Sequence, residues 1–373
     1  MSIKEKVLIY PFDREFMPML RSSSFNDKYE VIGLVSPNGW GVNGKNAGYL
    51  DLGEDLCIKI SKDFFSLIDE CDTVIFNKSN ISLDFDKFIK PKLNSCIEKN
   101  KNIICTIFLE KEVCDYISEK CISSNKYFKY YDIESMIGNY ECDVEYIHKF
   151  NTPVIFVLGM SECTNKFYIQ LQLRDIYKKT GYKIAQIGSK HYCEMLDFHS
   201  MPVFMYSSNI ADYKKIVMFN HYLKNIEVTE NPDLIIIGVP GGLFPINDQF
   251  TNKFGIMAYE IARAVTPDAV VLSTLYEKYN SKFFNEVCTV VRYRFGADVD
   301  CCNISNMKFD WSTSSQNNLL SYTMIDSKVI DNMKDTLTSA SVPIYNCLNN
   351  KDIKTMADYI IEKLSSYSDI ETV

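Results

Sequence analysis

The feature that most constrains the fold is a regular alternation of short apolar runs with helix-like stretches. In the first part of the chain the apolar runs are Val7–Tyr10, Val31–Val35, Thr73–Phe76 and Asn102–Ile107. Helical patterns such as Phe64–Glu70 and Phe88–Lys99 lie between them. Strands that alternate with helices over short links predict a parallel sheet with helical crossovers. We therefore expect an α/β fold whose N-terminal domain is Rossmann-like.

The alternation starts again at Asn151–Pro153 and continues through the C-terminal part of the chain. The expected strands are Val154–Leu158, Lys183–Ile187, Leu234–Val239, Ala269–Ser273 and Asp298–Ile304. The expected helices are Phe167–Lys179, Asp212–Lys224, Phe254–Ala264, Lys278–Tyr293, Asp331–Ser339 and Asp352–Ser365. Because 373 residues are too many for one ordinary core, we expect two domains, a Rossmann-like α/β domain over 1–150 and a degenerate P-loop α/β domain over 151–373.

A polar loop between the strand Val154–Leu158 and the helix Phe167–Lys179 has the composition of an anion site. In a strand–loop–helix unit, backbone N–H groups and the helix N-terminus together attract phosphate. Lys166 stands where a P-loop lysine reaches terminal phosphates. The expected phosphate-binding residues are Gly159, Met160, Ser161, Glu162, Cys163, Thr164, Asn165, Lys166 and Phe167, with Lys190, Gly241 and Gly242. A plain strand-to-helix turn with an incidental lysine is the alternative.

The loop resembles the G-T-x-x-x-x-G-K-T loop of the dethiobiotin synthetase and cobyrinic acid amidase group of P-loop proteins. The spacing from Gly159 to Lys166 is one residue longer than in the common P-loop. The segments YKIAQIGSK, ending at Lys190, and LIIIGVPGGLFPI also match that group, so the similarity covers roughly Pro153 to Ser273. The resemblance implies a site for ATP or GTP with Mg²⁺.

Three positions depart from that group. Asn165 replaces the glycine before the lysine, Phe167 replaces a Ser or Thr that binds Mg²⁺, and Gly238 replaces a Glu. Residues that could take over metal binding are Ser161, Glu162, Glu194 and Asp197. The metal ligands are therefore undefined, and the loop is a degenerate P-loop.

The stretch Lys190–His199 follows the second strand of this domain and contains half of the four histidines. Parallel sheets bind ligands at the carboxyl ends of their strands, so its side chains could supply acid–base chemistry. The candidate catalytic residues are Lys166, Glu162, Asp197 and His199. Polar loop residues that face solvent or cap a helix are an equally good interpretation. Further along, Thr251 or Asn252 is the expected N-cap of the helix Phe254–Ala264.

Composition limits the partners and the compartment. A net charge of −8 argues against a nucleic-acid binder. The thirteen cysteines are scattered without a C-x-x-C pair, so a zinc or iron–sulfur site is poorly supported. No signal peptide or membrane span is recognisable, and we expect a cytoplasmic protein without membrane contact and with reduced thiols.

Over most of its length the chain resembles the peptide maturation system proteins of clostridial natural-product gene clusters. The phrases that carry the resemblance are GWGVNGKNAGYLDLG, VLGMSECTNKF, GVPGGLFPINDQFTNKFGIMAYE, AVTPDAV and YRFGADVDCCNISN. It implies a role beside a radical enzyme in processing a ribosomally synthesised precursor peptide (a RiPP), with homo-oligomerisation possible. A looser similarity to P-loop D-glutamate N-acetyltransferases implies that the loop could hold the phosphates of CoA.

Three functional hypotheses follow. The first is a nucleotide-binding maturation factor, with ATP-dependent activation of a peptide group possible. The second is a CoA-dependent acyltransferase, which needs no metal. The third is a non-catalytic peptide-binding module with a degenerate P-loop. Fold-level analogy does not decide among them.

Overall fold

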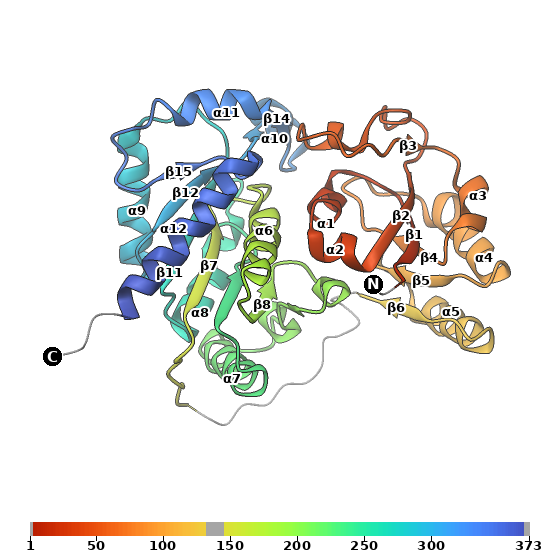
Figure 1. Cartoon of the computed structure of the whole chain (residues 1–373), viewed down its shortest axis with the longest axis horizontal. Helices are drawn as coiled ribbons and strands as arrows, with labels where there is room; N and C mark the ends of the chain where they lie inside the picture. Colours follow the sequence, from red (N-terminus) through yellow and green to blue (C-terminus); the bar gives the residue numbers. More distant parts are fainter. Residues whose placement is uncertain (1–2, 132–144, 369–373) are drawn as a thin grey trace. The chain divides into compact units, whose positions relative to one another are not determined.

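The computed structural model describes residues 3–131 and 145–368. The chain divides into two compact units, Met1–Ser135 and Met136–Val373 (Figure 1). Each unit is built on a large parallel β-sheet that is flanked by helices. The expected α/β class, a Rossmann-like sheet followed by a P-loop NTPase-like sheet, is confirmed.

The first unit contains a six-stranded parallel sheet with the order β3-β2-β1-β4-β5-β6. The strands are β1 Glu5–Tyr10, β2 Tyr29–Val35, β3 Ile60–Ser61, β4 Thr73–Phe76, β5 Asn102–Cys105 and β6 Phe128–Tyr130. This order, in which the chain reverses direction across the sheet at β1, is that of doubly wound nucleotide-binding folds. The short strands β3 and β6 were not predicted, because two or three residues give too little alternation to recognise.

Helices cover both faces of the first sheet. They are α1 Met17–Leu20, α2 Ser23–Lys28, α3 Phe64–Leu67, α4 Lys90–Glu98 and α5 Lys111–Ser123. Leu8 and Tyr10 of β1 pack with α3, α4 and α5 on one face. Val7 and Ile9 are fully buried on the opposite face, as expected when successive side chains point to opposite sides of a covered sheet.

The second unit contains a seven-stranded parallel sheet with the order β15-β12-β11-β7-β10-β8-β9. Its strands are β7 Val154–Gly159, β8 Ile184–Gly188, β9 His199–Ser200, β10 Leu234–Gly238, β11 Ala269–Thr274, β12 Cys301–Ile304 and β15 Ile344–Tyr345. A separate antiparallel ribbon joins β13 Met307–Phe309 to β14 Tyr322–Met324. Strand β7, which leads into the predicted phosphate loop, is the central strand.

Helices cover both faces of the sheet of the second unit (Figure 1). The helices of this unit are α6 Lys166–Lys179, α7 Asp212–Glu230, α8 Ile256–Ala264, α9 Ser281–Phe295, α10 Trp311–Asn317, α11 Ser327–Lys334 and α12 Asn350–Ser368. Helices α6 and α12 share one apolar core with the sheet, and α7, α8 and α9 share the other. The helix expected at Asp331–Ser339 instead starts at Ser327 and ends at Lys334, because Asp326 caps it by accepting from the Lys328 N–H at 2.8 Å.

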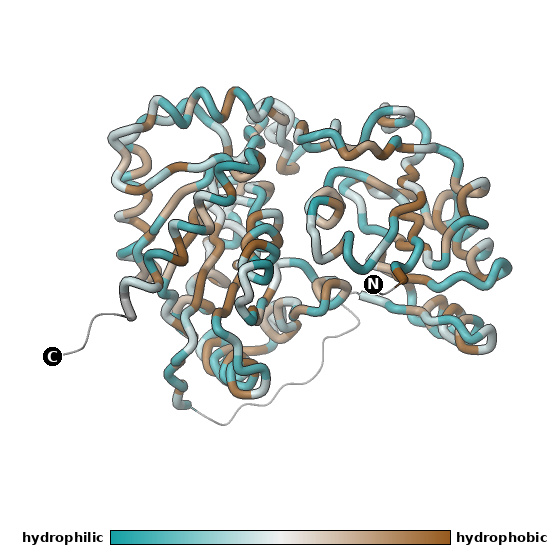
Figure 2. Tube along the Cα trace, viewed as in Figure 1, coloured by the Kyte–Doolittle hydropathy of each residue, from teal (hydrophilic) through white to brown (hydrophobic). Residues whose placement is uncertain are grey.

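The continuous apolar run in β7 follows from this layered arrangement. Val154, Phe156 and Leu158 belong to the core beneath α7, α8 and α9. Ile155 and Val157 belong to the core beneath α6 and α12. A strand buried on both faces has no polar positions, and the central strands are accordingly among the most hydrophobic stretches of the chain (Figure 2).

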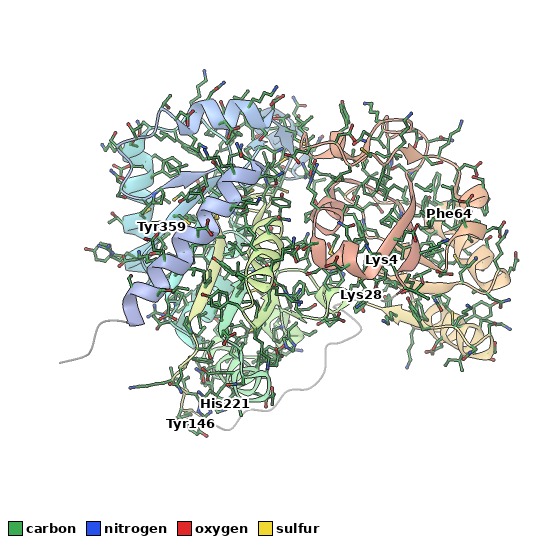
Figure 3. The ribbon with its side chains drawn as sticks, viewed as in Figure 1. Lys4, Lys28, Phe64, Tyr146, His221 and Tyr359 are labelled. Atoms are coloured by element: carbon green, nitrogen blue, oxygen red, sulfur yellow. The ribbon has the colours of Figure 1, made fainter. Side chains whose placement is uncertain are left out.

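The segment that enters the second unit packs on α7. The Asn220 side chain, which is fully buried, accepts from the His148 N–H at 2.7 Å and donates to the His148 carbonyl at 3.0 Å. Tyr146 and His221 lie together beside this contact (Figure 3), with ring centroids 5.2 Å apart. The polar residues before β7 are therefore part of the packed structure of this unit.

Candidate phosphate-binding site

The loop between β7 and α6 is sharply curved. The backbone bends at every residue from Met160 to Asn165. Cys163 and Asn165 have left-handed backbone conformations, with φ of 57° and 60°, and Thr164 between them does not. Successive N–H groups in a tight turn of this kind can face one concavity, an arrangement that binds anions. The loop therefore has the backbone shape that the sequence predicted.

Several N–H groups of this loop have no acceptor. None of the residues 3–131 and 145–368 accepts a hydrogen bond from the backbone N–H of Ser161, Glu162, Thr164 or Asn165. Backbone donors in folded proteins are nearly always paired with protein, water or a ligand. Four such donors in one bend of five residues are available to an anion.

The carbonyl side of the loop is held in place by the sheet. The Met160 N–H donates to the Ser273 carbonyl on β11 at 2.9 Å, and the Ser273 hydroxyl donates to the Thr164 carbonyl. The Thr164 hydroxyl donates to the Ser161 carbonyl at 3.2 Å. Fixing the carbonyls in this way leaves the N–H groups pre-organised, so little ordering is needed when a ligand binds.

Gly159 is required at the start of the loop. A Cβ atom at this position would lie 2.5 Å from Thr164 Oγ1 and 2.6 Å from Lys166 Cδ. Both atoms belong to buried side chains that the loop itself packs against the strand end. Any larger residue would force the Thr164 and Lys166 side chains to move.

Lys166 is the first residue of α6, and its side chain is only 6% exposed. Its ammonium donates to the carbonyls of Ser161, at 3.3 Å, and Gly241. The Glu162 carboxylate lies 3.8 Å from the ammonium. Burial lowers the pKa of Lys166, the charge on Lys190 lowers that pKa further, and Glu162 opposes the shift. The lysine thus lies inside the curve of the loop, and Lys190 places a second positive charge nearby.

Asn165, the first departure from the P-loop pattern, preserves the loop geometry. The glycine of the usual pattern tolerates a left-handed conformation, and asparagine is the side-chain-bearing residue that adopts it most readily. Here Asn165 has that conformation, and its Nδ2 donates to Asn306 Oδ1 at 3.1 Å. The replacement of glycine therefore does not disrupt the loop.

The other two departures remove metal ligands. Phe167 is 5% exposed and packs edge-on against Tyr192, with ring centroids 6.0 Å apart, so no hydroxyl replaces the usual one there. At the end of β10, a Cβ on Gly238 would lie 2.0 Å from Gln170 Cδ. The neutral Gln170 amide therefore occupies the space that a side chain at position 238 would need. Within the described ranges no group of three or more His, Cys, Asp or Glu residues could hold a metal ion.

The candidate catalytic residues of the Lys190–His199 stretch are not all brought to the loop. His199 lies on β9, the edge strand, where its Nε2 contacts Glu230. Three strand spacings separate β9 from β7, which corresponds to about 14 Å. The Glu194 carboxylate accepts from the N–H and hydroxyl of Ser200, at 2.8 and 2.6 Å.

Asp197 closes the short 3₁₀ turn Cys193–Leu196 in a left-handed conformation, and its carbonyl accepts from Arg174 at 3.3 Å. The Asp197 carbonyl therefore holds the turn, and His199 lies at the sheet edge, away from the loop. Lys190 and Glu162 remain close to the loop lysine.

The Gly241–Gly242 turn lies against the phosphate loop, as the sequence predicted. Gly242 approaches so closely that a Cβ would lie 2.8 Å from the Met160 carbonyl. A cavity of about 410 Å³ begins at this turn and at Glu162. Its remaining walls are Tyr206, Pro240, Gln249, Phe250, Thr251, Asn252, Lys253, Gly255, Ile256, Met257, Ala258 and Leu320. This volume suits a small organic ligand.

A left-handed turn lines this cavity, and the sequence did not indicate it. Asn252, Lys253, Phe254 and Gly255 have φ of 49°, 50°, 55° and 67°. Helix α8 consequently begins at Ile256 instead of Phe254, and neither Thr251 nor Asn252 caps it with a side-chain hydrogen bond. The N-cap prediction was wrong. Three consecutive non-glycine residues rarely adopt this conformation, and no sequence pattern predicts it.

Comparisons with known proteins give a fold and no family. No protein-family model and no curated protein matches the chain. A solved structure of a DUF1611 family protein from Anabaena variabilis ATCC 29413 is similar over 96% of this chain and 100% of that chain, at 10% identity with a TM-score of 0.62. At that identity the similarity shows the fold alone.

Two further solved structures are P-loop NTPases. The MinD cell division protein of Aquifex aeolicus aligns over 60% of this chain and 99% of its own, at 12% identity and a TM-score of 0.31. The signal recognition particle 54 kDa protein of Aeropyrum pernix K1, solved in complex with GDP, covers 75% of this chain and 61% of its own, at 12% identity and a TM-score of 0.31. Within the described part of the chain, no helix is both long and apolar enough to cross a membrane.

Proposed function

We propose that the loop Gly159–Lys166 binds the phosphate chain of a nucleoside triphosphate, and that the protein uses it in maturing a ribosomally synthesised peptide. The observation that carries the nucleotide proposal is the set of unpaired N–H groups at Ser161, Glu162, Thr164 and Asn165 around the buried Lys166 ammonium. Phosphate oxygens accept such hydrogen bonds strongly because they are charged. ATP and GTP both present the required group.

The chain's own residues have defined tasks in this proposal. The loop amides hold phosphate oxygens, and Lys166 leaves its carbonyl partners to pair with the terminal phosphate. Lys190 adds charge nearby. Ser161, whose hydroxyl lies 3.4 Å from the Tyr322 hydroxyl, and Glu162 are the oxygen donors that could support Mg²⁺. A bound Mg²⁺ would neutralise phosphate charge during transfer.

A specific observation favours CoA as the second candidate ligand. Phe167 and Gln170 leave the site without the hydroxyl and the carboxylate that hold Mg²⁺ in the related enzymes. A ligand with phosphates that reacts elsewhere, as CoA does at its thioester, needs only the anion-binding part of the loop. The same observation is compatible with a binding module that performs no chemistry. The precursor peptide and a radical enzyme are the proposed partners, on the sequence resemblance described above.

A thermal-shift screen of the full chain with ATP, GTP and CoA, each with and without Mg²⁺, tests the proposal. A ligand that binds only the folded state raises Tm by mass action. We expect ATP or GTP to raise Tm, Lys166→Ala to abolish the increase, and Lys179→Ala, an exposed lysine on the same helix, to leave it intact. A response to CoA alone would favour the acyltransferase. Absence of any nucleotide effect would contradict the nucleotide proposal.

A further inference from the structure

A second ligand site lies beside the phosphate loop, in the 410 Å³ cavity that starts at Glu162 and the Gly241–Gly242 turn. We propose that this cavity binds an organic carboxylate with an apolar body, and that the carboxylate lies on the left-handed turn Asn252–Gly255. That this ligand is the second substrate of a phosphate-using protein rests on the proposed function. That it binds in the cavity does not.

Unpaired donors gather at the turn. In the part of the chain that the structure describes, the backbone N–H groups of Asn252 and Lys253 and the Thr251 hydroxyl have no hydrogen-bond acceptor. The Lys253 ammonium has no carboxylate within 4 Å among those same residues. Two N–H groups, one hydroxyl and one ammonium on three consecutive residues match the acceptor oxygens of a single anionic group.

The turn is held in an unfavourable conformation by specific contacts. Left-handed backbone is unfavourable for residues other than glycine, and Asn252, Lys253 and Phe254 all adopt it. The Asn252 side chain donates to the Phe244 carbonyl at 2.7 Å, and a Cβ on Gly255 would lie 2.2 Å from the Leu243 carbonyl oxygen. Strained backbone that the surrounding structure enforces is concentrated at ligand sites. The turn therefore presents its donors in a fixed direction.

The rest of the cavity defines the body of the ligand. Phe250, Met257 and Leu320 provide apolar wall. The one carboxylate that lines the cavity, Glu162, already faces the Lys166 ammonium at 3.8 Å. A free cation would find no unpaired carboxylate there, whereas an anion finds Lys253. An acid with an aliphatic or aromatic body satisfies both parts of the cavity.

Head-group discrimination by the full chain tests the proposal. Saturation-transfer NMR titrations would use four probes that each contain six carbon atoms: hexanoate, hexylamine, hexanol and hexyl phosphate. We expect hexanoate to bind with a Kd at least about tenfold below those of hexanol and hexylamine, since a charge-assisted hydrogen bond is worth a factor of that order. Equal binding of the alcohol or the amine would overturn the carboxylate assignment. Tighter binding of hexyl phosphate than of hexanoate that Lys253→Met weakens would also overturn it, and would assign the turn to a phosphate.

Variants of the turn locate the binding. Lys253→Met and Thr251→Val keep the side-chain size, and each should raise the hexanoate Kd by roughly tenfold. Lys282→Met, which removes a lysine of α9 with an 80% exposed side chain, is the matched control and should change nothing. Circular dichroism would show that each variant is folded. Hexanoate binding that is unaffected by both turn variants would place the site elsewhere and contradict the proposal.

The two proposals fail independently. If ATP fails to bind the unmodified protein while hexanoate binds with the expected discrimination, the nucleotide proposal fails and the carboxylate site stands. The reverse result overturns only the carboxylate site.

Discussion

Asn165 shows how one residue of a consensus motif can be replaced while the backbone conformation of the loop is kept. The position needs a left-handed backbone, and asparagine satisfies that need while adding a hydrogen bond to Asn306. The sequence located the loop and its lysine correctly, because a glycine, a polar bend and a lysine before a helix are local signals. It could not show that Gln170 fills the space above Gly238, because that contact joins two elements far apart along the chain.

Substitutions of Asn165 should separate backbone from side-chain effects. Asn165→Gly keeps the left-handed conformation and loses one hydrogen bond, so the free energy of unfolding should change by about 1 kcal/mol or less. Asn165→Val forces a β-branched residue into that conformation and should cost about 2 kcal/mol. Urea unfolding measures both. Equal stability of the two variants would show that this backbone conformation is not required.

Glu260 on α8 should make stability depend on pH. Its side chain is almost fully buried, 3.4 Å from the Lys215 ammonium, and burial raises its pKa from 4.5 to about 7. Between about pH 4.5 and 7 the folded protein keeps a proton on Glu260 that the unfolded chain releases. Proton binding to Glu260 therefore stabilises the folded protein at low pH, and this stabilisation is lost as the pH rises through that window.

The matching variant is Glu260→Gln, which cannot ionise. Relative to the unmodified protein, it should gain roughly 2 kcal/mol in the free energy of unfolding between pH 5 and pH 8. Urea titrations at both pH values measure that difference. A stability difference that does not vary with pH would mean that the pKa of Glu260 is not raised.

At the scale of elements, the strands and helices of the second unit were predictable where they are long and periodic. Strand β10 and helix α6 fall within a residue of the expected ranges. The two-residue strands β9 and β15 and the left-handed turn before α8 were missed. Short strands form because a neighbouring strand pairs with them, and the turn forms because Leu243 and Phe244 hold it. Neither cause is visible in local sequence.

The strain in that turn gives a prediction at Phe254, whose side chain is 55% exposed and whose φ is 55°. Phe254→Gly should be neutral or raise the free energy of unfolding by up to about 1 kcal/mol, because glycine adopts this conformation without steric cost. Phe254→Val should lower it by about 1–2 kcal/mol. Thermal unfolding of the pair measures the difference. If valine proved the more stable variant, the turn would not be left-handed.

At the scale of the whole molecule, two sheets with their own cores explain the length of the chain. The α/β class and the order of a Rossmann-like and a P-loop-like unit could be predicted, because strand–helix alternation is repeated along the sequence. The point where the second unit begins was harder to predict. Polar residues before β7 look like a linker, yet His148 is tied to the buried Asn220 by two hydrogen bonds.

Truncations should reveal that contact. A fragment starting at residue 145 should fold alone, since it contains the complete seven-stranded sheet and both of its cores. A fragment starting at residue 150 loses both hydrogen bonds between His148 and Asn220 and should be about 2 kcal/mol less stable. Chemical unfolding followed by circular dichroism compares them. Equal stabilities would show that the segment before β7 does not contribute to the unit.

The central claim is that the curved loop and its lysine bind phosphate. Titration calorimetry of the full chain with tripolyphosphate, which has no base, sugar or acyl group, isolates that interaction. We expect a 1:1 complex whose Kd rises at least about tenfold in Lys166→Met and is unchanged in Lys179→Met. Tripolyphosphate that fails to bind, or that binds both variants as it binds the unmodified protein, would contradict the claim.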